Sequence, residues 1–511
     1  MSQSIEQYIH NSWTVLRRTL RDLPRAAYDP KYELEDGSSL VYVPPGEDLA
    51  EVTSRLSQAL STQEIQTLSL RALTPEALAA PSSIAHHGLL YLPHPYVVPG
   101  GRFNEMYGWD SYFINLGLLK AGLPEEAWQM TENHLYQVEH YGKILNANRT
   151  YYLTRSQPPF LAPMVWECYQ ATQDRGRLEA SLDGLLKTYQ LWVGPNHLTP
   201  ETGLSRYFDW GDGPAPEVLS SECDEYGLSH YDRIKEEFKS MAGWSSEKQQ
   251  RELGYPLELY YDRKNDALSD LFYKGDRTMR ESGFDPSDRF GRFNLDVIHY
   301  NPVDLNSLLY LYECQMARIV GELEMIEQVA TWRARAERRA RLMQELFWDQ
   351  EQQLFFDYNF RTGERRHYPF ATAFFPLYTG WATQKQSELL SQRLEEFLHP
   401  GGVVTSFHRS GNQWDYPYGW APLQLVAALG LQRYGYLEQA RRVASAFTGL
   451  VEQEFERTGT VLEKYDVVNG TSSVSEGIEF GYSSNEVGFG WTNGVYLVLK
   501  EMCQVLSSPS P

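Results

Sequence analysis

The sequence LNSLLYLYECQMARIVGE (residues 305–322), followed by MIEQVATWRARAERRARLMQEL (residues 325–346), sets the pattern for most of the chain. Apolar residues recur at helical spacing in both segments, and the Arg-rich run 333–341 fits a solvated helix face. Further amphipathic stretches lie at residues 125–141, 163–173, 178–193, 385–398, 422–434, 437–454 and 494–505. Gly-Pro, Asp-Gly and Pro-Gly pairs separate them, and no segment alternates strictly enough to predict an extensive sheet. We therefore predict an all-α protein built of antiparallel helical hairpins.

Two parts of the chain fall outside the hairpin pattern. Residues 1–84 hold helix-like stretches at 4–23 and 48–60, with an extended Pro- and Gly-containing stretch between them. We expect this part to be an extension packed on a main domain of residues 85–511. Residues 204–284 form a loop-rich excursion that we expect to arch over a cleft as a lid. Loops at one end of a hairpin ring suit a binding cleft, because rigid elements then hold the functional side chains.

Composition limits the class of protein. The chain has 511 residues, 42% hydrophobic and 14% aromatic, which is enough for a large core with aromatic residues to spare. Its formal net charge of −21 argues against nucleic acid or an anionic membrane surface as a partner. Four scattered cysteines predict free thiols in a reducing cytoplasm. Neither a signal peptide nor an apolar run of about 20 residues is seen. We expect a soluble cytoplasmic protein.

The first polar cluster is PGGRFNEMYGWDSY at residues 99–112. Its Gly pair lets the backbone bend, Arg102 offers a planar fork of donors, and Trp109 offers a stacking face beside the Asp110 acceptor. A purely structural explanation is a turn into a helix with Asp110 as its cap. That explanation accounts for Asp110 alone, but not for Arg, Glu, Trp and Asp within nine residues.

A second cluster, NANRTYYLTRSQPP at residues 146–159, has Asn, Arg and Gln side chains without apolar periodicity. We expect Asn148, Arg155 and Gln157 to be functional. For Asn146 and Arg149, a loop tied by its own side chains is an equally good explanation.

The third cluster is RESGFDPSDRF at residues 280–290, where Asp285 follows an aromatic residue. An aromatic wall desolvates a carboxyl group and raises its pKa, as a general acid at neutral pH requires. Asp285 is alternatively a helix cap after Gly283, and Asp288 is a rival acid. From these residues alone, Asp285 and Asp288 are equally good candidates for the general acid.

The last two clusters are QWDYPYGW (residues 413–420) and EKYDV (residues 463–467), the latter followed by GFGWTNG at residues 488–494. Trp414 and Asp415 repeat the Trp-Asp pair, and Glu463 is a candidate general base that holds a water. The alternatives are a helix entry for the first and a surface ion pair of Glu463 with Lys464 or Arg457 for the second. Together the clusters favour a sugar-cleaving cleft, where aromatic faces stack on a pyranose and two carboxyl groups supply acid and base. No HExxH, GxGxxG or Walker-type pattern occurs, so neither a metal nor a nucleotide cofactor is predicted.

In this order, the patterns resemble the inverting trehalase family of glycoside hydrolases over about residues 95–500. The resemblance implies an (α/α)6 toroid and single-displacement hydrolysis with inversion. It places Asp285 where the family has its general acid and Glu463 where it has the base. Positions matching those that hold the cleaved glucosyl ring are Arg102, Trp109, Asp110, Asn148, Arg155, Gln157, Trp414 and Asp415. Further substrate contacts are expected at Phe103, Tyr107, Glu217, Gly283, Tyr482 and Trp491.

Departures from the family pattern bear on the leaving group. Trehalases carry Arg-Pro-Glu in the lid, whereas residues 215–217 here are Ala-Pro-Glu. Tyr482 stands where a Glu is expected, and Tyr418 replaces an Asn. Loss of charged partners for hydroxyls disfavours a substrate that needs them. The acidic, aromatic segment 222–232 disfavours a charged glycerate.

The expected substrate is therefore a small α-glucoside, glucosylglycerol, a compatible solute that would be cleaved to glucose and glycerol. The alternatives are α,α-trehalose and glucosylglycerate or mannosylglycerate. Two other classes of protein fit the same residues less well. A sugar epimerase would need paired catalytic histidines, which are not seen, and a non-catalytic sugar-binding protein would not need both Asp285 and Glu463.

Overall fold

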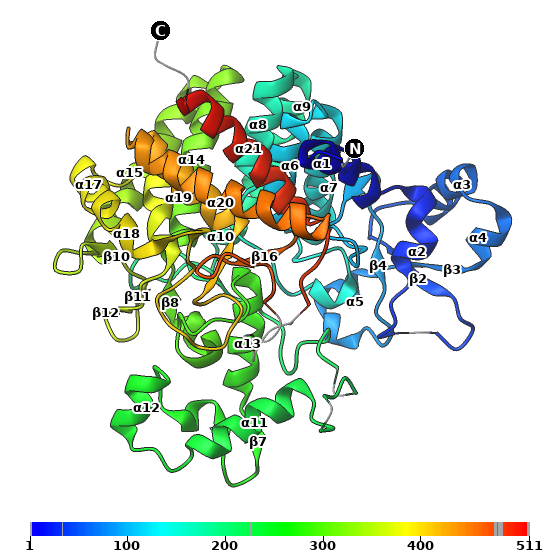
Figure 1. Cartoon of the computed structure of the whole chain (residues 1–511). Coiled ribbons are helices and arrows are strands. Elements are labelled where there is room, and N and C mark those ends of the chain that lie inside the picture. The colour runs from blue at the N-terminus through cyan, green and yellow to red at the C-terminus, as the bar shows by residue number, and fades with distance from the viewer. Residues whose placement is uncertain are drawn as a thin grey trace.

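Inner helices form a closed ring in the computed structural model, which describes residues 3–32, 34–219, 221–224, 226–474, 478 and 484–507. Each inner helix packs against the next, and the last returns to the first. Most of these helices are labelled in the upper part of Figure 1. The ring consists of α6 (Asp110–Lys120), α8 (Leu161–Thr172), α14 (Val303–Glu322), α16 (Phe375–Thr379), α19 (Ala421–Arg433) and α21 (Gly490–Ser507). Small residues let the ring close: a Cβ on Gly494 of α21 would lie 2.1 Å from the carbonyl oxygen of Phe113 in α6.

An outer layer of helices surrounds this ring. Most of its members are the second helices of hairpins whose amphipathic pattern was predicted, such as α14 and α15. The layer consists of α7 (Pro124–Tyr141), α10 (Leu182–Trp192), α15 (Ile326–Leu346), α17 (Gln384–Gln392), α20 (Leu437–Thr458) and α1 (Ile5–Leu16). The predicted (α/α)6 toroid is confirmed.

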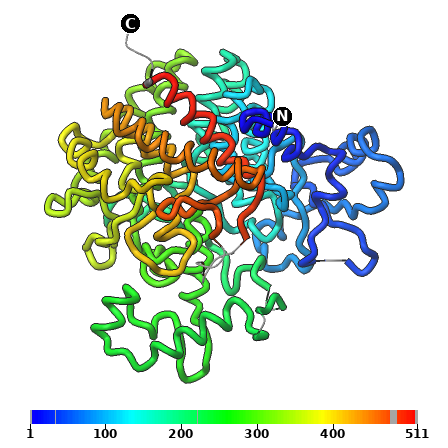
Figure 2. Tube along the Cα trace, viewed as in Figure 1, coloured from blue at the N-terminus to red at the C-terminus, as the bar shows by residue number. Residues whose placement is uncertain are grey.

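The N-terminal segment contributes to the toroid as well as extending from it. Helix α1 packs on α21, so the blue start of the chain lies beside the red C-terminal helix (Figure 2). The helix predicted over 4–23 stops at Leu16, because Arg17–Arg18 form β1 and pair with β5 (Tyr96–Val97). Beyond it lies a parallel sheet of order β3-β2-β4. Its strands are β2 (Ser39–Val43), β3 (Leu68–Ala72) and β4 (Leu89–Leu90), so contacts cross the predicted boundary at residue 84.

The excursion at residues 204–284 contains helices that its Gly- and Pro-rich flanks concealed. These are α11 (His230–Met241), α12 (Ser246–Glu252) and α13 (Asp270–Ser282), drawn in green at the foot of Figure 1. Their apolar faces form a small cluster of their own, which includes Ile234, Phe238 and Phe272. The segment is therefore a folded element that α13 joins to the ring; it keeps the name lid for the role expected from sequence.

Strands elsewhere are short and occur in sheets of two or three in the described part of the chain. The pair that matters for the site is β15 (Tyr418–Trp420) and β16 (Lys464–Asp466), which align Trp420 opposite Lys464. The remaining strands are β6 (Tyr261–Asp262), β7 (Ala267–Leu268), β8 (Tyr300–Asn301), β9 (Trp348–Asp349), β10 (Leu354–Phe355), β11 (Tyr358–Asn359), β12 (Glu364–Arg365), β13 (Leu398–His399) and β14 (Gly402–Val403). The remaining α-helices are α2 (Leu23–Ala27), α3 (Leu49–Ala59), α4 (Thr62–Gln66), α5 (Pro75–Ala79), α9 (Arg175–Ala180) and α18 (Leu394–Phe397).

Candidate active site

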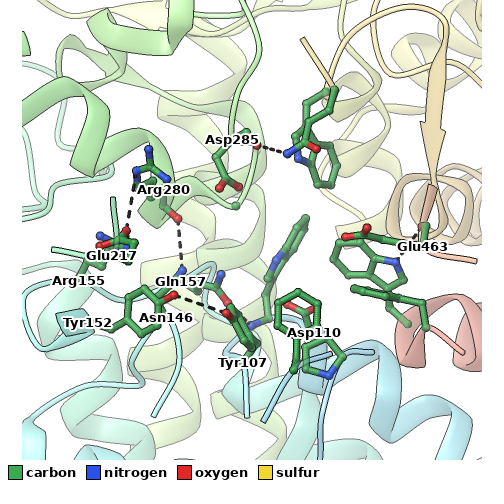
Figure 3. Close-up of a pocket in the computed structure, with 18 of the residues that line it drawn as sticks. Tyr107, Asp110, Asn146, Tyr152, Arg155, Gln157, Glu217, Arg280, Asp285 and Glu463 are labelled. Carbon is green, nitrogen blue, oxygen red and sulfur yellow. Dashed lines mark hydrogen bonds and ion pairs between the residues drawn. The ribbon is translucent and has the colours of Figure 1, made fainter. Parts of the chain in front are cut away.

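A cavity of about 190 Å³ opens where the loops before α6, α8, α19 and α21 meet the end of α13 (Figure 3). The loops come from segments far apart in sequence, yet each enters the N-terminal end of an inner helix or leaves the lid. The predicted residues on its wall are Arg102, Phe103, Tyr107, Trp109, Asp110, Arg155, Gln157, Glu217, Gly283, Asp285, Trp414, Glu463 and Trp491. Most of the residues expected from sequence therefore share one cavity.

Asp285 lies on the lid side of this cavity. It follows α13, whose last turn ends at Gly283 in the left-handed conformation. Desolvation raises the pKa of Asp285 to about 6, although the nearby Arg280 and Arg155 guanidinium groups oppose the rise. A carboxyl group in this range is protonated in a useful fraction near neutral pH, as a general acid must be.

Asp288, the rival of Asp285, is not on the cavity wall. Its carboxylate accepts hydrogen bonds from the Asn412 side chain at 2.7 Å and the Phe293 amide at 3.0 Å, and it pairs with Arg292 at 3.0 Å. Through these contacts the Asp288 carboxylate stabilises the loop after α13. The geometry thus separates two acids that the residues alone leave even.

Glu463 projects from a different wall than Asp285 (Figure 3), and its side chain is 1% exposed. It directly precedes β16, and its backbone amide donates to Asn485 Oδ1 at 3.2 Å. Trp491 donates its indole N–H to the Glu463 carbonyl at 3.3 Å. The alternative of a surface ion pair does not hold, because Glu463 and Lys464 are both buried, with Lys464 Nζ 4.0 Å from the Glu463 carboxylate, and Arg457 pairs with Glu454.

The side chain of Gln413 joins the two carboxylate segments. Its amide nitrogen donates to the Asp285 backbone carbonyl, and its oxygen accepts from Lys464 Nζ at 3.0 Å. Burial lowers the pKa of Lys464 to about 8, while the adjacent Glu463 opposes that change. Gln413 therefore fixes the spacing of Asp285 and Glu463 across the cavity.

A third carboxyl group, Asp110, faces the same cavity. Burial raises the pKa of Asp110 to about 8, and the carboxylates of Glu463 and Asp285 add to the rise. Asp110 is the first residue of α6 and Trp109 occupies the cap position, so capping does not explain its presence. Its carboxyl group can accept a hydrogen bond from a bound hydroxyl when ionised and donate one to it when protonated.

An aromatic wall completes the inner end of the cavity. Trp109, Trp414 and Trp491 contact one another with ring centroids 5.8 to 6.2 Å apart. Trp420 stacks behind Trp414 at 4.0 Å with an interplanar angle of 7° and so fixes its ring. Gly283 is required here, because a Cβ on it would lie 2.9 Å from the Trp109 indole.

On the Asp285 side the wall is charged. Glu217 of the lid pairs with Arg155, and Arg280 lies 3.9 Å from the same carboxylate oxygen. Burial alone would raise the pKa of Glu217, but Arg155 and Arg280 hold it at about 2. This fixed cluster of one carboxylate and two guanidinium groups presents acceptors and donors for hydroxyl groups.

Some predicted contacts are not on the wall. The prediction is wrong for Asn148, whose side chain is buried between the Met106 amide and the Leu90 carbonyl at 2.8 and 3.0 Å. It is also wrong for Asp415, which accepts from Ser406, Ser410 and Tyr368. Both are absent from the wall because they support the loops behind it. Tyr482 lies outside the described residues.

Sequence reasoning missed other lining residues. Asn146, Tyr152, Arg280 and Gln413 all face the cavity. Each lies in one of the clusters described above, but other residues of those clusters were predicted to bind substrate. For Asn146, a structural and a functional role were equally consistent with the sequence. Their position in those polar, aperiodic stretches was the only available signal.

Among the described residues, no group of three His, Cys, Asp or Glu side chains is placed to hold a metal ion. No helix within the same residues has the length and apolar character that a bilayer crossing requires.

A helical toroid whose loops bring an acidic pair, an aromatic wall and hydroxyl-binding charges into one cavity defines a glycoside hydrolase. The chain belongs to the trehalase family, whose family model matches residues 4–504. It is 34% identical to a cytosolic neutral trehalase of Emericella nidulans, over 98% of this chain and 72% of that protein. It is 36% identical to a cytosolic neutral trehalase of Saccharomyces cerevisiae, over 79% of this chain but only 56% of that protein.

Solved structures agree. The neutral trehalase of Saccharomyces cerevisiae superposes with a TM-score of 0.80 at 32% identity, covering 97% of this chain and 93% of that chain. A mannosylglycerate hydrolase of Thermus thermophilus reaches a TM-score of 0.53 at 18% identity, covering 79% of this chain and 95% of that chain. The second likeness shows the fold alone.

Proposed function

We propose that the protein hydrolyses α,α-trehalose to two glucose molecules with inversion at the cleaved anomeric carbon. Asp285 donates a proton to the glycosidic oxygen as the C1–O bond breaks. Glu463 removes a proton from the water that attacks C1 from the opposite face. The observation that carries the proposal is that these two carboxyl groups line one cavity from different walls. An inverting pair must stand on opposite sides of the sugar with room for the water between them.

The geometry supports trehalose over glucosylglycerol. Ala215 had suggested a missing cation in the lid, but its side chain is buried and 1% exposed. Arg280 of α13 instead provides a cation beside Glu217. Tyr418 lies in β15 and not on the cavity wall, so that departure does not change the wall. The side of the cleft near Asp285 therefore keeps charged partners for a polyhydroxylated leaving group.

There is also room on that side. A second cavity of about 280 Å³ shares Glu217, Arg280, Asp285 and Gln413 with the first. Since Asp285 protonates the leaving oxygen, the leaving group must lie on its side. A second hexose suits this space better than glycerol. The relatives are named cytosolic neutral trehalases, which also favours this substrate and the cytoplasmic location expected from sequence.

A substrate panel tests the proposal. Trehalose, glucosylglycerol, glucosylglycerate and mannosylglycerate are supplied at equal concentration, and free sugar is measured over time. Trehalose is expected to give the highest kcat/KM. Proton NMR during the first turnovers should show one α- and one β-glucose from each trehalose. Faster cleavage of glucosylglycerol would overturn the substrate, and two α-glucoses would overturn inversion.

The rate should fall above the pKa of Asp285. Because the acid acts only when protonated, kcat/KM for trehalose is expected to decline above about pH 6. Replacing Arg280 by Met removes a cation that lowers the pKa of Asp285, so this pKa rises. The acid then stays protonated to higher pH, and the declining limb should move upward while the absolute rate falls. A pH–rate profile in which the limb stays or moves downward contradicts this assignment.

Gly283 provides a test of the aromatic wall. In Gly283→Ala, alanine must adopt the left-handed conformation of Gly283, which costs about 1–2 kcal/mol of stability. The substitution also drives a methyl group into Trp109. Displacing a substrate-facing ring by about 1 Å is expected to lower kcat/KM roughly 10²-fold. Gly459→Ala is the matched control: Gly459 also ends a helix with φ 74°, but nothing lies within 4 Å of its Cβ position. It should lose stability in thermal melts but keep its kcat/KM, and equal kinetic losses in both variants would contradict the argument.

A further inference from the structure

The N-terminal segment reaches the active-site lid. Residues 26–29 lie against the loop that precedes α8, where the buried Arg149 donates to the Ala26 carbonyl at 2.9 Å and the Tyr28 carbonyl at 3.2 Å. Arg149 also pairs with the buried Asp29 at 3.4 Å. This segment is therefore fixed to the same loop that carries Tyr152 and Arg155 of the cavity wall.

Lys31 and Tyr32 hold the lid backbone. Lys31 Nζ donates to the Glu217 carbonyl at 2.6 Å, and the Tyr32 hydroxyl donates to the Pro216 carbonyl at 2.7 Å. Lys31 also lies 3.6 Å from the Glu222 carboxylate. The lid is thus bound at two successive carbonyl groups by side chains nearly two hundred positions away in sequence.

Both side chains are themselves held in place. The Lys31 amide donates to Asp29 Oδ1 at 3.0 Å, which sets the local turn. The Tyr32 ring packs edge-on against His87 at 4.8 Å and beside Tyr151 at 6.3 Å. Since Asp29 is bound to Arg149, the chain of contacts runs without a break from the α8 loop to the lid.

These contacts act on Glu217. The residue whose carbonyl Lys31 binds carries the carboxylate that lies between Arg155 and Arg280 on the cavity wall. A rotation of the lid about residue 216 would withdraw that carboxylate from the cleft.

We propose that Lys31 and Tyr32 fasten the lid, so that Glu217 stays in place for the leaving group. Lys31 also lines the second cavity, so Tyr32, which lines neither cavity, is the residue that reports on positioning alone. The proposal rests on the proposed function for its kinetic consequence only. Each hydrogen bond to a lid carbonyl increases the ratio of closed to open lid a few-fold. Losing both should raise KM by about tenfold or more, while kcat, set by Asp285 and Glu463, changes little.

The test compares the full-length chain with Lys31→Met, Tyr32→Phe and the double variant. Phe keeps the ring packing and Met keeps the aliphatic stem, so the fold is retained, and Tyr32→Phe alone suffices if the double variant folds poorly. Hydrogen–deuterium exchange in the substrate-free protein reports on the amides of residues 217–219. Faster exchange there, with melting temperature and other regions unchanged, is expected. Lys31→Arg, which keeps a donor, should restore most of the protection and of the KM.

Tyr226→Phe and Lys264→Met are the controls, because both side chains are exposed on the lid. They should behave as wild type. Unchanged exchange at 217–219 in the double variant overturns the proposal, as does a KM equal to that of wild type. An equal rise in exchange over the whole chain also overturns it, since the residues would then be general stabilising contacts. If wild type prefers another glucoside, the proposed function fails, yet exchange and the KM for that glucoside still test the lid contacts.

Discussion

Asp285→Asn is expected to lower kcat for trehalose by about 10²- to 10⁴-fold, the usual contribution of a positioned general acid. Asn has nearly the same shape as Asp but has no proton to give to the glycosidic oxygen. The leaving glucose would depart as an alkoxide, which is a poor leaving group. KM should change little, because the cavity wall keeps its outline.

A substrate whose leaving group needs no proton shows whether the loss in Asp285→Asn is a loss of acid catalysis. Fluoride departs without protonation, so α-glucosyl fluoride should be hydrolysed by Asp285→Asn at a rate close to that of wild type. A stopped assay for fluoride release beside one for glucose from trehalose measures both. If the variant loses activity equally on the two substrates, Asp285 has a structural or binding role and not the proposed one.

Asp288→Asn is the control for this experiment. Asp288 is three residues away and carries the same functional group, but its bonds to Asn412, Phe293 and Arg292 hold the loop. This variant should lower the melting temperature and leave the ratio of fluoride to trehalose turnover unchanged. A selective loss on trehalose in Asp288→Asn would restore it as the acid.

The outer helices could be predicted from sequence because each has one apolar face. The ends of α15 and α7 fall within a residue of the predicted segments. Helix α6 was not among the predicted amphipathic segments and entered only as the structural alternative for residues 99–112, because it is buried on most sides and so has no polar face to give a period. Helix α11 does carry an apolar stripe of Ile234, Phe238 and Met241, but its loop-like flanks obscured it.

The candidate site was predictable where chemistry clusters in sequence, and not where it depends on distant contacts. Residues 99–112 hold several wall residues in one stretch. Of the site residues predicted within the described part of the chain, all except Asn148 and Asp415 line the cavity. An inward Asn and a supporting Asn look alike in sequence, because only tertiary hydrogen bonds distinguish them. The missing Arg at 215 misled for the same reason, since Arg280 approaches from another element.

Glu463→Gln is expected to lower kcat by about 10²- to 10⁴-fold as well, but with the opposite response to the leaving group. The amide cannot take a proton from water, and a better leaving group does not remove that need. Hydrolysis of α-glucosyl fluoride should therefore stay low in Glu463→Gln, whereas Asp285→Asn is restored. This crossed pattern separates base from acid without any structural measurement.

Glu463→Ala extends the test because it vacates space beside the attack position. Azide is already an anion and needs no base, so added azide should restore turnover of α-glucosyl fluoride and yield β-glucosyl azide. Glu454→Gln is the control: Glu454 is also buried, but it binds Arg457 and Ser472 away from the cavity. It should lose stability without azide dependence. A Glu463→Gln enzyme that keeps more than about a tenth of its kcat would mean that another group activates the water, and Asp110 in the same cavity is a candidate. Formation of the α-azide by Glu463→Ala would mean net retention and would overturn the single displacement.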